Sequence, residues 1–255
     1  MKDYIYEIYN EKLFSKNSTA YLKNKNISYN LERHQGNHYF FTSDFKNFFP
    51  SIPEEKARSI LKDKFDQETL NYIIKISFYN NSLQYGFPTS PIISNIVMKE
   101  FDDSFQNELL KNISSKNIQY TRYSDDITIS SKYKIEKNLL RKLLNEELEK
   151  YNFLNLNEKK TRYFEKFSKK PYITGLVPLN RRTSIGKRKY NQVKLNIYLI
   201  LNNQVISNEK FYQNEKSLKS YLSYLYLVDK HNYNRLKNFY LKKISKNELN
   251  KIFTK

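Results

Sequence analysis

The chain of 255 residues has no cysteine, and its three histidines are His34, His38 and His231. Disulfide bonds and thiolate metal sites are therefore excluded, and a histidine-rich zinc site is not expected. Long apolar runs are also lacking, because no stretch approaches the roughly 18 apolar residues that a membrane-spanning helix requires. Residues 1–14 carry charges throughout, without the apolar core of a signal peptide. These absences predict a cytoplasmic protein with no membrane partner.

Acidic residues are scarce relative to basic ones, since 26 Asp and Glu stand against 45 Lys and Arg, for a net charge of +19. Most of the excess lies in residues 181–255, which hold 17 Lys and Arg but only 4 Asp and Glu. Such a charge favours a polyanionic partner and speaks against a specialist for acidic small molecules. The 23 Tyr and 17 Phe suit base stacking, which points to nucleic acid. An AT-rich coding bias that inflates Lys and Tyr is the alternative, although it explains the uneven charge less well.

Glycine is rare as well, with four in the chain, and it is missing from the corner of a predicted hairpin at residues 118–131. β-branched and aromatic residues alternate with polar ones on both sides of the corner, which indicates two short strands. The corner itself holds Asp125 and Asp126. Two adjacent carboxylates repel each other unless a cation lies between them, so the pair suggests a metal site. The alternative is a solvated pair in a loop.

A second apolar run, at residues 39–41, predicts a buried strand that ends at Asp44. A carboxylate at the end of a buried aromatic strand is costly without a cation or a partner. If this strand and the hairpin are neighbours in one sheet, Asp44, Asp125 and Asp126 converge on one edge of it. Alternatively, Asp44 only caps the following turn.

Apolar residues at helical spacing predict helices in much of the remaining chain. One helix is expected to begin with Ser90 as its N-cap and Pro91 in its first turn, and to run to about Leu110. The expected apolar faces are Leu70, Ile73, Ile74 and Phe78; Val97, Phe101, Phe105 and Leu109; Leu139, Leu140, Leu143, Leu144 and Leu148; Tyr190, Val193, Ile197, Ile200 and Leu201; Leu222, Leu225 and Leu227; and Leu236, Phe239, Tyr240 and Ile244.

Four motifs together resemble the palm motifs of reverse transcriptases, in their usual order and spacing. They are Asp44 at the end of an aromatic strand, Gly-x-Pro-Thr-Ser-Pro at 86–91, Tyr-x-Asp-Asp at 123–126 and Asn-x-x-Lys-Thr at 157–161. The match covers about residues 30–245. The chain departs from the family at Tyr85, where a Gln is expected, so contacts to the nucleotide or template at that position are in doubt.

Two further motifs resemble signatures of the retron-type reverse transcriptases. Residues 30–34 resemble their Asn-Ala-x-x-His, with Leu in place of Ala, and an Ile-Thr-Gly that ends in Thr174 and Gly175 resembles their Val-Thr-Gly. The resemblance leaves open whether Asn30 and His34 support a structured RNA or the fold. Another defence-associated reverse transcriptase, including relatives that make DNA without a conventional template, is the alternative.

The resemblance implies an α+β fold, a right-hand polymerase with reduced fingers. Residues 1–43 and 52–90 would form the fingers, residues 44–51 and 91–180 an antiparallel-sheet palm with the catalytic carboxylates, and residues 181–255 a basic helical thumb. The thumb would then carry most of the positive charge of the chain.

The resemblance also implies a two-metal catalytic site. Asp44 and Asp125 would bridge two Mg²⁺ ions, Asp126 would be a supporting ligand, and the main-chain carbonyl of Phe45 would complete one metal shell. Two such ions activate a primer hydroxyl and stabilise the departing pyrophosphate. Carboxylates are the hard ligands that Mg²⁺ prefers.

Other site residues follow from the same family. Phe49 would pack under the sugar and exclude a ribose 2′-hydroxyl, unless it is only a core residue. Tyr85 and Gly86 would contact the nucleotide, and Lys160 would neutralise or protonate the leaving pyrophosphate, unless it is a surface charge. Residues expected to contact nucleic acid are Tyr123, Arg181, Arg182, Lys187, Arg188 and Lys189, and candidates for binding the triphosphate are Lys23, Lys25 and Arg33.

The resemblance therefore predicts an RNA-directed DNA polymerase, a nucleotidyltransferase that depends on two Mg²⁺ ions. Its partners would be dNTPs, an RNA/DNA template–primer, a structured noncoding RNA that serves as template and primer, and a separate effector protein in anti-phage defence. The alternative from a different class is a non-catalytic RNA-binding scaffold on a polymerase fold. A general basic nucleic-acid binder is a third, but it would not need the paired carboxylates.

Overall fold

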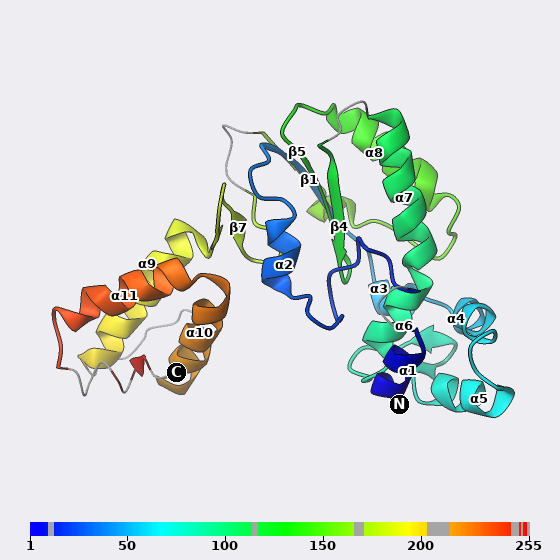
Figure 1. Cartoon of the computed structure of the whole chain (residues 1–255), viewed down its shortest axis with the longest axis horizontal. Helices are drawn as coiled ribbons and strands as arrows, with labels where there is room; N and C mark the ends of the chain where they lie inside the picture. The colour runs from blue at the N-terminus through cyan, green and yellow to red at the C-terminus, as the bar shows by residue number, and fades with distance from the viewer. Residues whose placement is uncertain are drawn as a thin grey trace. The chain divides into compact units, whose positions relative to one another are not determined.

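The computed structural model describes residues 1–9, 13–113, 117–165, 171–202, 215–245, 250 and 252–253. The chain divides into two compact units, Met1–Thr174 and Gly175–Lys255 (Figure 1). Among the described residues, no helix combines the length and the apolar composition that crossing a membrane requires.

A four-stranded antiparallel sheet forms the middle of the first unit, and its strand order is β4-β5-β1-β6. The strands are β4 (Gln119–Tyr123), β5 (Asp126–Ser131), β1 (Tyr39–Asp44) and β6 (Arg162–Phe164). The predicted hairpin is confirmed, since β4 and β5 pair directly, and the predicted strand at residues 39–44 is its neighbour. The register sets the last residue of β1 opposite the first residue of β5, which brings the two strand ends together at one edge.

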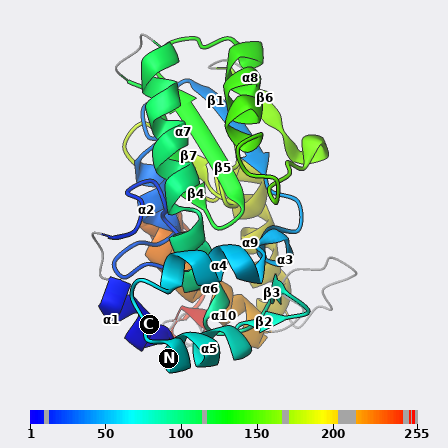
Figure 2. The same cartoon turned by 90° about the vertical axis from the view of Figure 1, so that its right-hand side faces the viewer.

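Helices cover both faces of this sheet. Figure 2 shows α7 (Lys99–Asn112) and α8 (Lys137–Leu148) in front of one face, and Figure 1 shows α2 (Ile27–Glu32) beside the other. Neighbouring residues of a strand point to opposite faces. Tyr120 therefore makes a ring contact with α7, whereas Thr121 meets the histidine that follows α2.

The hydrophobic core lies between the sheet and α7 and α8. The buried residues that fill it include Phe41, Ile127 and Ile129 from the strands, Phe101, Phe105 and Leu109 from α7, and Leu140, Leu143 and Leu144 from α8. The apolar faces predicted for these two helices are therefore the faces that pack. Because such packing tolerates little change in shape, the core holds the edge of the sheet in place.

The remaining elements of the first unit lie around this core. They are α1 (Lys2–Tyr9), α3 (Phe48–Ser51), α4 (Glu54–Leu61), α5 (Gln67–Lys75), β2 (Phe78–Tyr79), β3 (Ser82–Leu83), α6 (Ser90–Val97) and the short 3₁₀ helix η2 (Glu158–Lys160).

The helix predicted to start at Ser90 differs in two details. Its N-cap is Thr89, which makes no side-chain cap bond because its Oγ1 lies 2.7 Å from the hydroxyl of Ser77 instead. The helix is also interrupted at Met98, whose φ of −80° and ψ of −3° end α6 before α7 begins. Ser90 is thus wrong as the N-cap, and one predicted helix is two.

Phe78 lies outside the helix to which its spacing assigned it. α5 ends at Lys75, and Phe78 opens the short hairpin of β2 and β3. The hairpin turn is formed by Asn80 and Asn81, which have φ values of 47° and 59°. Two positive φ values in succession are the requirement of a type I′ turn, which asparagine tolerates better than most residues.

The second unit begins with a two-stranded hairpin and continues as helices. The hairpin is β7 (Val177–Pro178) with β8 (Thr183–Ser184), and the helices are α9 (Gly186–Leu201), α10 (Glu215–Val228) and α11 (Lys230–Leu241). Its buried residues include Tyr190, Val193, Ile197, Leu222, Leu225, Leu236 and Tyr240. Leu227 was expected among them but is 76% exposed, because it stands on the outer side of α10.

Candidate active site

Three carboxylates meet at the edge where β1 and the β4–β5 hairpin end. Asp44 closes β1, Asp126 opens β5 opposite it, and Asp125 occupies the turn just before. One carboxylate oxygen from each lies within 4.8 Å of the other two. Asp44 is buried, whereas Asp125 and Asp126 are partly exposed, so the cluster opens to solvent on one side. The convergence expected from the strand ends is present.

The charges of this carboxylate cluster are incompletely balanced. Burial, followed by the charges of Asp125 and Asp44, raises the pKa of Asp126 to about 7. Burial and the charge of Asp44 also raise the pKa of Asp125. Both shifts mean that the site favours a further positive charge.

Lys160 supplies one cation to the cluster. Its ammonium lies 3.0 Å and 2.9 Å from the two carboxylate oxygens of Asp44, and this contact raises the pKa of Lys160. The segment that carries it is fixed to β1, because the N–H of Asn157 donates to the carbonyl of Asp44 at 2.7 Å. The Lys160 side chain is nevertheless 60% exposed.

The donor set fits a hard divalent cation. Three carboxylates offer only oxygen ligands, which Mg²⁺ prefers, and their mutual repulsion would be relieved by a divalent charge. Phe45 lies directly after Asp44, and its N–H donates to the carbonyl of Asp125 at 3.1 Å. The backbone of Phe45 is therefore part of the same edge, as the prediction of a carbonyl ligand requires.

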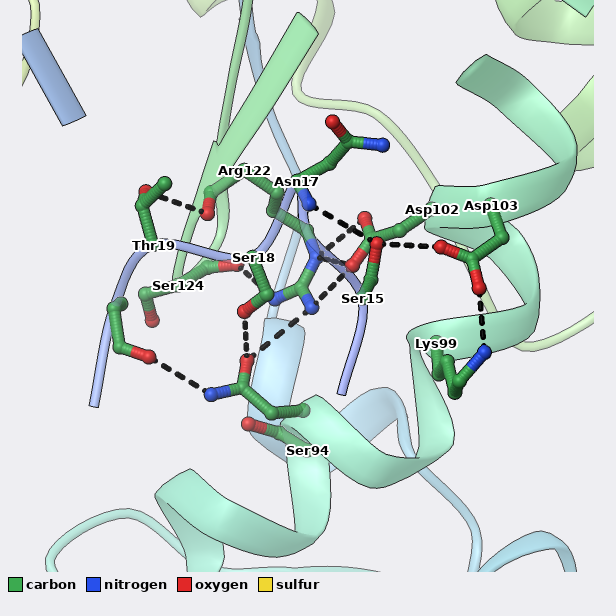
Figure 3. Close-up of polar contacts among 12 residues, drawn as sticks. Ser15, Asn17, Ser18, Thr19, Ser94, Lys99, Asp102, Asp103, Arg122 and Ser124 are labelled. Atoms are coloured by element: carbon green, nitrogen blue, oxygen red, sulfur yellow. Dashed lines mark hydrogen bonds and ion pairs between the residues drawn. The ribbon is translucent and has the colours of Figure 1, made fainter. Parts of the chain in front are cut away.

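The turn between β4 and β5 bends at Ser124, which has a φ of 59° without being glycine. Two contacts hold it there. Arg122 Nη1 donates to the main-chain carbonyl of Ser124 at 2.8 Å (Figure 3), and the hydroxyl of Tyr21 donates to Ser124 Oγ at 3.2 Å. An unusual backbone conformation persists when its surroundings fix it in this way.

Arg122 is anchored by a fully buried ion pair with Asp102. Its Nε and Nη2 donate to the two carboxylate oxygens of Asp102, at 2.8–3.1 Å, and neither side chain is exposed (Figure 3). Burial alone would lower the pKa of Arg122, but the carboxylate outweighs it and the pKa is raised. The hydroxyl of Tyr120 donates to the same carboxylate at 2.7 Å. This pair was not singled out from the sequence, because its members lie on different elements.

The segment that carries Tyr21 is attached to the same network. The N–H of Arg122 donates to the carbonyl of Asn17, and the N–H of Thr19 donates to the carbonyl of Arg122, both at 2.9 Å. Asn95 adds a side-chain link, since its Nδ2 donates to the carbonyl just before Tyr21 at 2.8 Å. These bonds fix the backbone of Tyr21, whose φ of 61° is uncommon for a large side chain.

The two residues of the retron-like signature in residues 30–34 are buried. Nδ1 of His34 lies 2.7 Å from Ser130 Oγ and its Nε2 lies 2.7 Å from Thr121 Oγ1, so its ring ties β5 to β4. Burial, and then the charge of Arg33, lower the pKa of His34 to about 3, which keeps the ring neutral. Asn30 accepts from the hydroxyl of Thr19 at 2.8 Å. With both side chains buried, a role in the fold is favoured over RNA contact.

An aromatic group lies next to the carboxylates. The ring of Phe49 has its centroid 5.3 Å from that of Tyr85 and 6.4 Å from that of Tyr21. Burial, and then the charges of Asp125 and Asp44, raise the pKa of the Tyr85 hydroxyl. The predicted Phe49 and Tyr85 are thus brought together. Tyr21 was missed, since nothing in its sequence context predicts its backbone conformation.

The residue after Tyr85 is Gly86, which has a φ of 80°. A Cβ atom added there would meet nothing within 4 Å, so space does not require glycine. The backbone does, because a left-handed φ is costly for other residues. Gly86 thereby sets the direction of the chain at Tyr85.

A hollow of about 410 Å³ adjoins the carboxylate cluster on the side of β6. Asp44, Asp126 and Lys160 line it together with Tyr172 and Thr174. Thr174 has a φ of 47°, and its buried Oγ1 finds no hydrogen-bond partner among the residues that the structure describes. Of the predicted Thr-Gly pair, Thr174 therefore lies next to the cluster.

The basic residues predicted to contact nucleic acid differ in how exposed their side chains are. In the second unit, Arg181, Arg182, Lys187 and Arg188 are exposed, whereas Lys189 is partly buried and donates to the carbonyl of Gly175 at 3.2 Å. The exposed ones stand at the β7–β8 turn and the start of α9. They form a basic edge that is free to contact phosphates.

In the first unit, Tyr123 is the last residue of β4 and is partly buried beside the carboxylates. Burial, and then the charges of Tyr21 and Asp126, raise its pKa. The three candidates for the triphosphate are engaged elsewhere. Lys23 lies over the ring of Tyr6, Lys25 donates to the carbonyl of Ser18, and Arg33 donates to the carbonyl of Lys16.

A family model described as reverse transcriptase (RNA-dependent DNA polymerase) matches residues 1–210 of the chain. The retron Ec73 reverse transcriptase of Escherichia coli is 29% identical over 239 residues, which cover 88% of this chain and 74% of that protein. The retron Ec86 reverse transcriptase of Escherichia coli is 27% identical over 241 residues, which cover 93% and 71%.

Among solved structures, apo telomerase from Candida tropicalis matches with a TM-score of 0.50 and 11% identity. The match covers 93% of this chain but 50% of that one, so the chain spans half the length of the telomerase. At this identity the match bears on the fold alone, and it agrees with the α+β polymerase architecture predicted from the motifs.

Proposed function

Because the chain belongs to the reverse transcriptase family, we propose that it is a retron-type RNA-directed DNA polymerase that works with Mg²⁺ at Asp44, Asp125 and Asp126. The observation that carries the proposal is the convergence of three carboxylates within 4.8 Å. The similarity to two retron reverse transcriptases over most of the chain supports the retron type. We expect the protein to act in the cytoplasm.

The three carboxylates would hold two metal ions. Bound Mg²⁺ would lower the pKa of a primer hydroxyl and offset the charge that develops on the phosphate under attack. Asp44 and Asp125 would be the main ligands of the ions, and Asp126 and the carbonyl of Phe45 would be supporting ligands. The chain contributes by holding these groups in place before substrate arrives, since Asp125 and Asp126 directly follow Ser124, which a buried contact fixes.

Lys160 would act on the leaving pyrophosphate. Its ammonium already lies at the carboxylate cluster, and its exposed side chain is long enough to turn toward a neighbouring phosphate. A charged ammonium stabilises negative charge that builds up on the leaving group.

The substrates would be dNTPs and an RNA/DNA template–primer. Arg181, Arg182, Lys187 and Arg188 would contact phosphates of that duplex or of a structured noncoding RNA, because exposed cations neutralise the backbone without reading sequence. The retron type further implies that the RNA serves as template and primer, and that a separate effector protein acts with the enzyme in anti-phage defence.

The deciding experiment is to purify the protein from cells and to sequence its bound RNA and DNA. A branched RNA–DNA product is the expected result. Free repetitive DNA would favour a defence-associated enzyme with template-independent synthesis, and bound RNA without any DNA would favour a non-catalytic scaffold. Primer extension on a defined RNA template, with and without Mg²⁺, tests the polymerase activity separately.

A further inference from the structure

Three aromatic rings form a continuous group at the edge of the carboxylate cluster. Phe49 stands in the middle, with Tyr85 edge-on at 5.3 Å and 80° and Tyr21 tilted at 6.4 Å and 48°. A fourth ring, Phe48, supports Phe49 from the core at 5.3 Å. Phe49 is thus enclosed by rings on several sides.

Exposure separates the members of this group. Phe49 is 9% exposed, whereas Tyr21 is 48% and Tyr85 is 58% exposed. Most of the exposed surface of this aromatic group therefore belongs to the two tyrosine rings, and Phe49 contributes little of it.

Both tyrosines lie near the catalytic edge. The hydroxyl of Tyr21 donates to Ser124 Oγ, one residue before the turn carboxylates, and its backbone is fixed through Arg122 and Asn95. Tyr85 is close enough to Asp125 and Asp44 for their charges to raise the pKa of its hydroxyl. The Tyr21 ring therefore keeps a defined position relative to the carboxylates, and Tyr85 lies close to the same groups.

We propose that Tyr21 and Tyr85 are specificity-determining residues for the sugar of the incoming nucleotide, because each packs its ring against Phe49 and the two together clamp it. The proposal rests on the proposed function, since it assumes that Phe49 faces the sugar. A ring can exclude a ribose 2′-hydroxyl only if it does not yield when pressed. The edge-on contact with Tyr85 and the tilted contact with Tyr21 would oppose a rotation of the Phe49 ring.

The position of Tyr85 gives this clamp a chemical reason. The family pattern has a Gln there, whose amide cannot make an edge-to-face contact with Phe49. An apolar wall of rings also leaves a 2′-hydroxyl without a hydrogen-bond partner, which is costly for a polar group removed from water. In this chain the selection of deoxyribose is thus shared among three rings.

The test is primer extension on an RNA template with a DNA primer, in which kcat/KM is measured for dGTP and for GTP. Tyr85→Ala and Tyr21→Ala should each reduce the preference for dGTP about tenfold, and Phe49→Ala should reduce it at least as much. Tyr85→Phe keeps the ring and should retain the preference. Tyr21→Phe should lower kcat for both nucleotides by the same factor, since it loses only the bond to Ser124.

Tyr79 provides a matched control, because it is a 66% exposed tyrosine of β2 and Tyr79→Ala should change nothing. The clamp is refuted if the alanine variants lower kcat/KM for dGTP and GTP equally, or if Phe49→Ala alone relaxes selection. In both cases the proposed polymerase function stands. If the wild-type chain extends no primer with either nucleotide, the proposed function fails and the clamp fails with it.

Discussion

Arg122 donates a 2.8 Å hydrogen bond to the main-chain carbonyl of Ser124, and so a fully buried cation holds the residue that precedes both turn carboxylates. Arg122 in turn forms an ion pair with Asp102, whose side chain is not exposed to solvent. The position of the turn that carries the carboxylates is therefore set from inside the core. This relationship makes the stability of the site depend on a pair that touches no substrate.

Asp102→Asn should lower the free energy of unfolding by about 3 kcal/mol, because it leaves the buried guanidinium of Arg122 without a compensating charge. Denaturant unfolding monitored by circular dichroism measures the loss. Its neighbour offers a control of the same chemistry, since Asp103 is 42% exposed and its bond to Lys99 is a surface ion pair. Asp103→Asn should cost less than about 1 kcal/mol. An equal loss of unfolding free energy in the two variants would contradict a special stabilising role of the buried Arg122–Asp102 pair.

Asp125→Asn should abolish DNA synthesis while the protein stays folded. The substitution keeps the size of the side chain but removes the negative charge that a metal ion needs. Primer extension measures the activity, and thermal unfolding reports the fold. Asp63 is an exposed aspartate on the surface, so Asp63→Asn should retain full activity. Residual synthesis by Asp125→Asn above that of a sample without protein would remove Asp125 from the catalytic site.

Added Mg²⁺ should raise the melting temperature of the wild-type protein. A ligand that binds only the folded state stabilises it by about 2.7 kcal/mol at 100 times its Kd, and here it would also relieve repulsion among Asp44, Asp125 and Asp126. Differential scanning fluorimetry across a Mg²⁺ series, with EDTA as the starting condition, gives the shift. Asp126→Asn should show a smaller rise. An identical rise in that variant would mean that the ion binds elsewhere.

Stability should fall as the pH drops below about 6.5, with a contribution from His34. The folded pKa is lowered to about 3 whereas the unfolded ring titrates near 6.5, so the unfolded state binds more protons between these values. The contribution amounts to about 3 kcal/mol between pH 6.5 and pH 4. His34→Gln should be less stable at pH 7 yet depend less steeply on pH. His231→Gln, a control at an exposed position, should keep the wild-type dependence of stability on pH. If His34→Gln also keeps that dependence, the His34 ring does not contribute to it.

RNA binding should weaken steeply with salt, and the basic edge of the second unit should account for part of the slope. Removing one cation that neutralises a phosphate makes the plot of log K against log salt shallower by about 0.7 to 0.9. Arg181→Ala with Arg182→Ala should therefore reduce the steepness by about 1.5 in fluorescence anisotropy titrations. Lys62→Ala, in an exposed position of the first unit, should leave the slope unchanged. An unchanged slope in the double variant would place the RNA contacts elsewhere.

The sequence predicted those parts of the fold in which a periodic apolar pattern marks an element and a polar residue marks its end. The alternation at residues 118–131 specified the hairpin, and the apolar run before Asp44 specified its neighbouring strand. Since the strand ends in aspartate and the hairpin carries two aspartates at its corner, pairing the two elements was enough to gather the carboxylates. The apolar faces of α7 and α8 followed in the same way, because a core face repeats along a helix.

The parts that escaped prediction depend on partners far apart in the chain. His34 bonds to residues 87 and 96 positions away, and no periodic pattern shows which strands a polar ring will join. Tyr21 and Ser124 have left-handed φ values that local propensity assigns to glycine, and only their tertiary hydrogen bonds hold them. The prediction that Leu227 is buried was wrong for a different reason, since an apolar residue at helical spacing does not have to face the core.

The contact between Lys160 and Asp44 bears on whether the chain folds before or after it binds metal. An ammonium on the most buried carboxylate acts as a built-in counter-ion, so the strands can come together before any ion has arrived. Small zinc domains differ in this respect, because their folding waits for the metal. In this chain, we expect metal binding to exchange one counter-ion for another in a protein that has already folded.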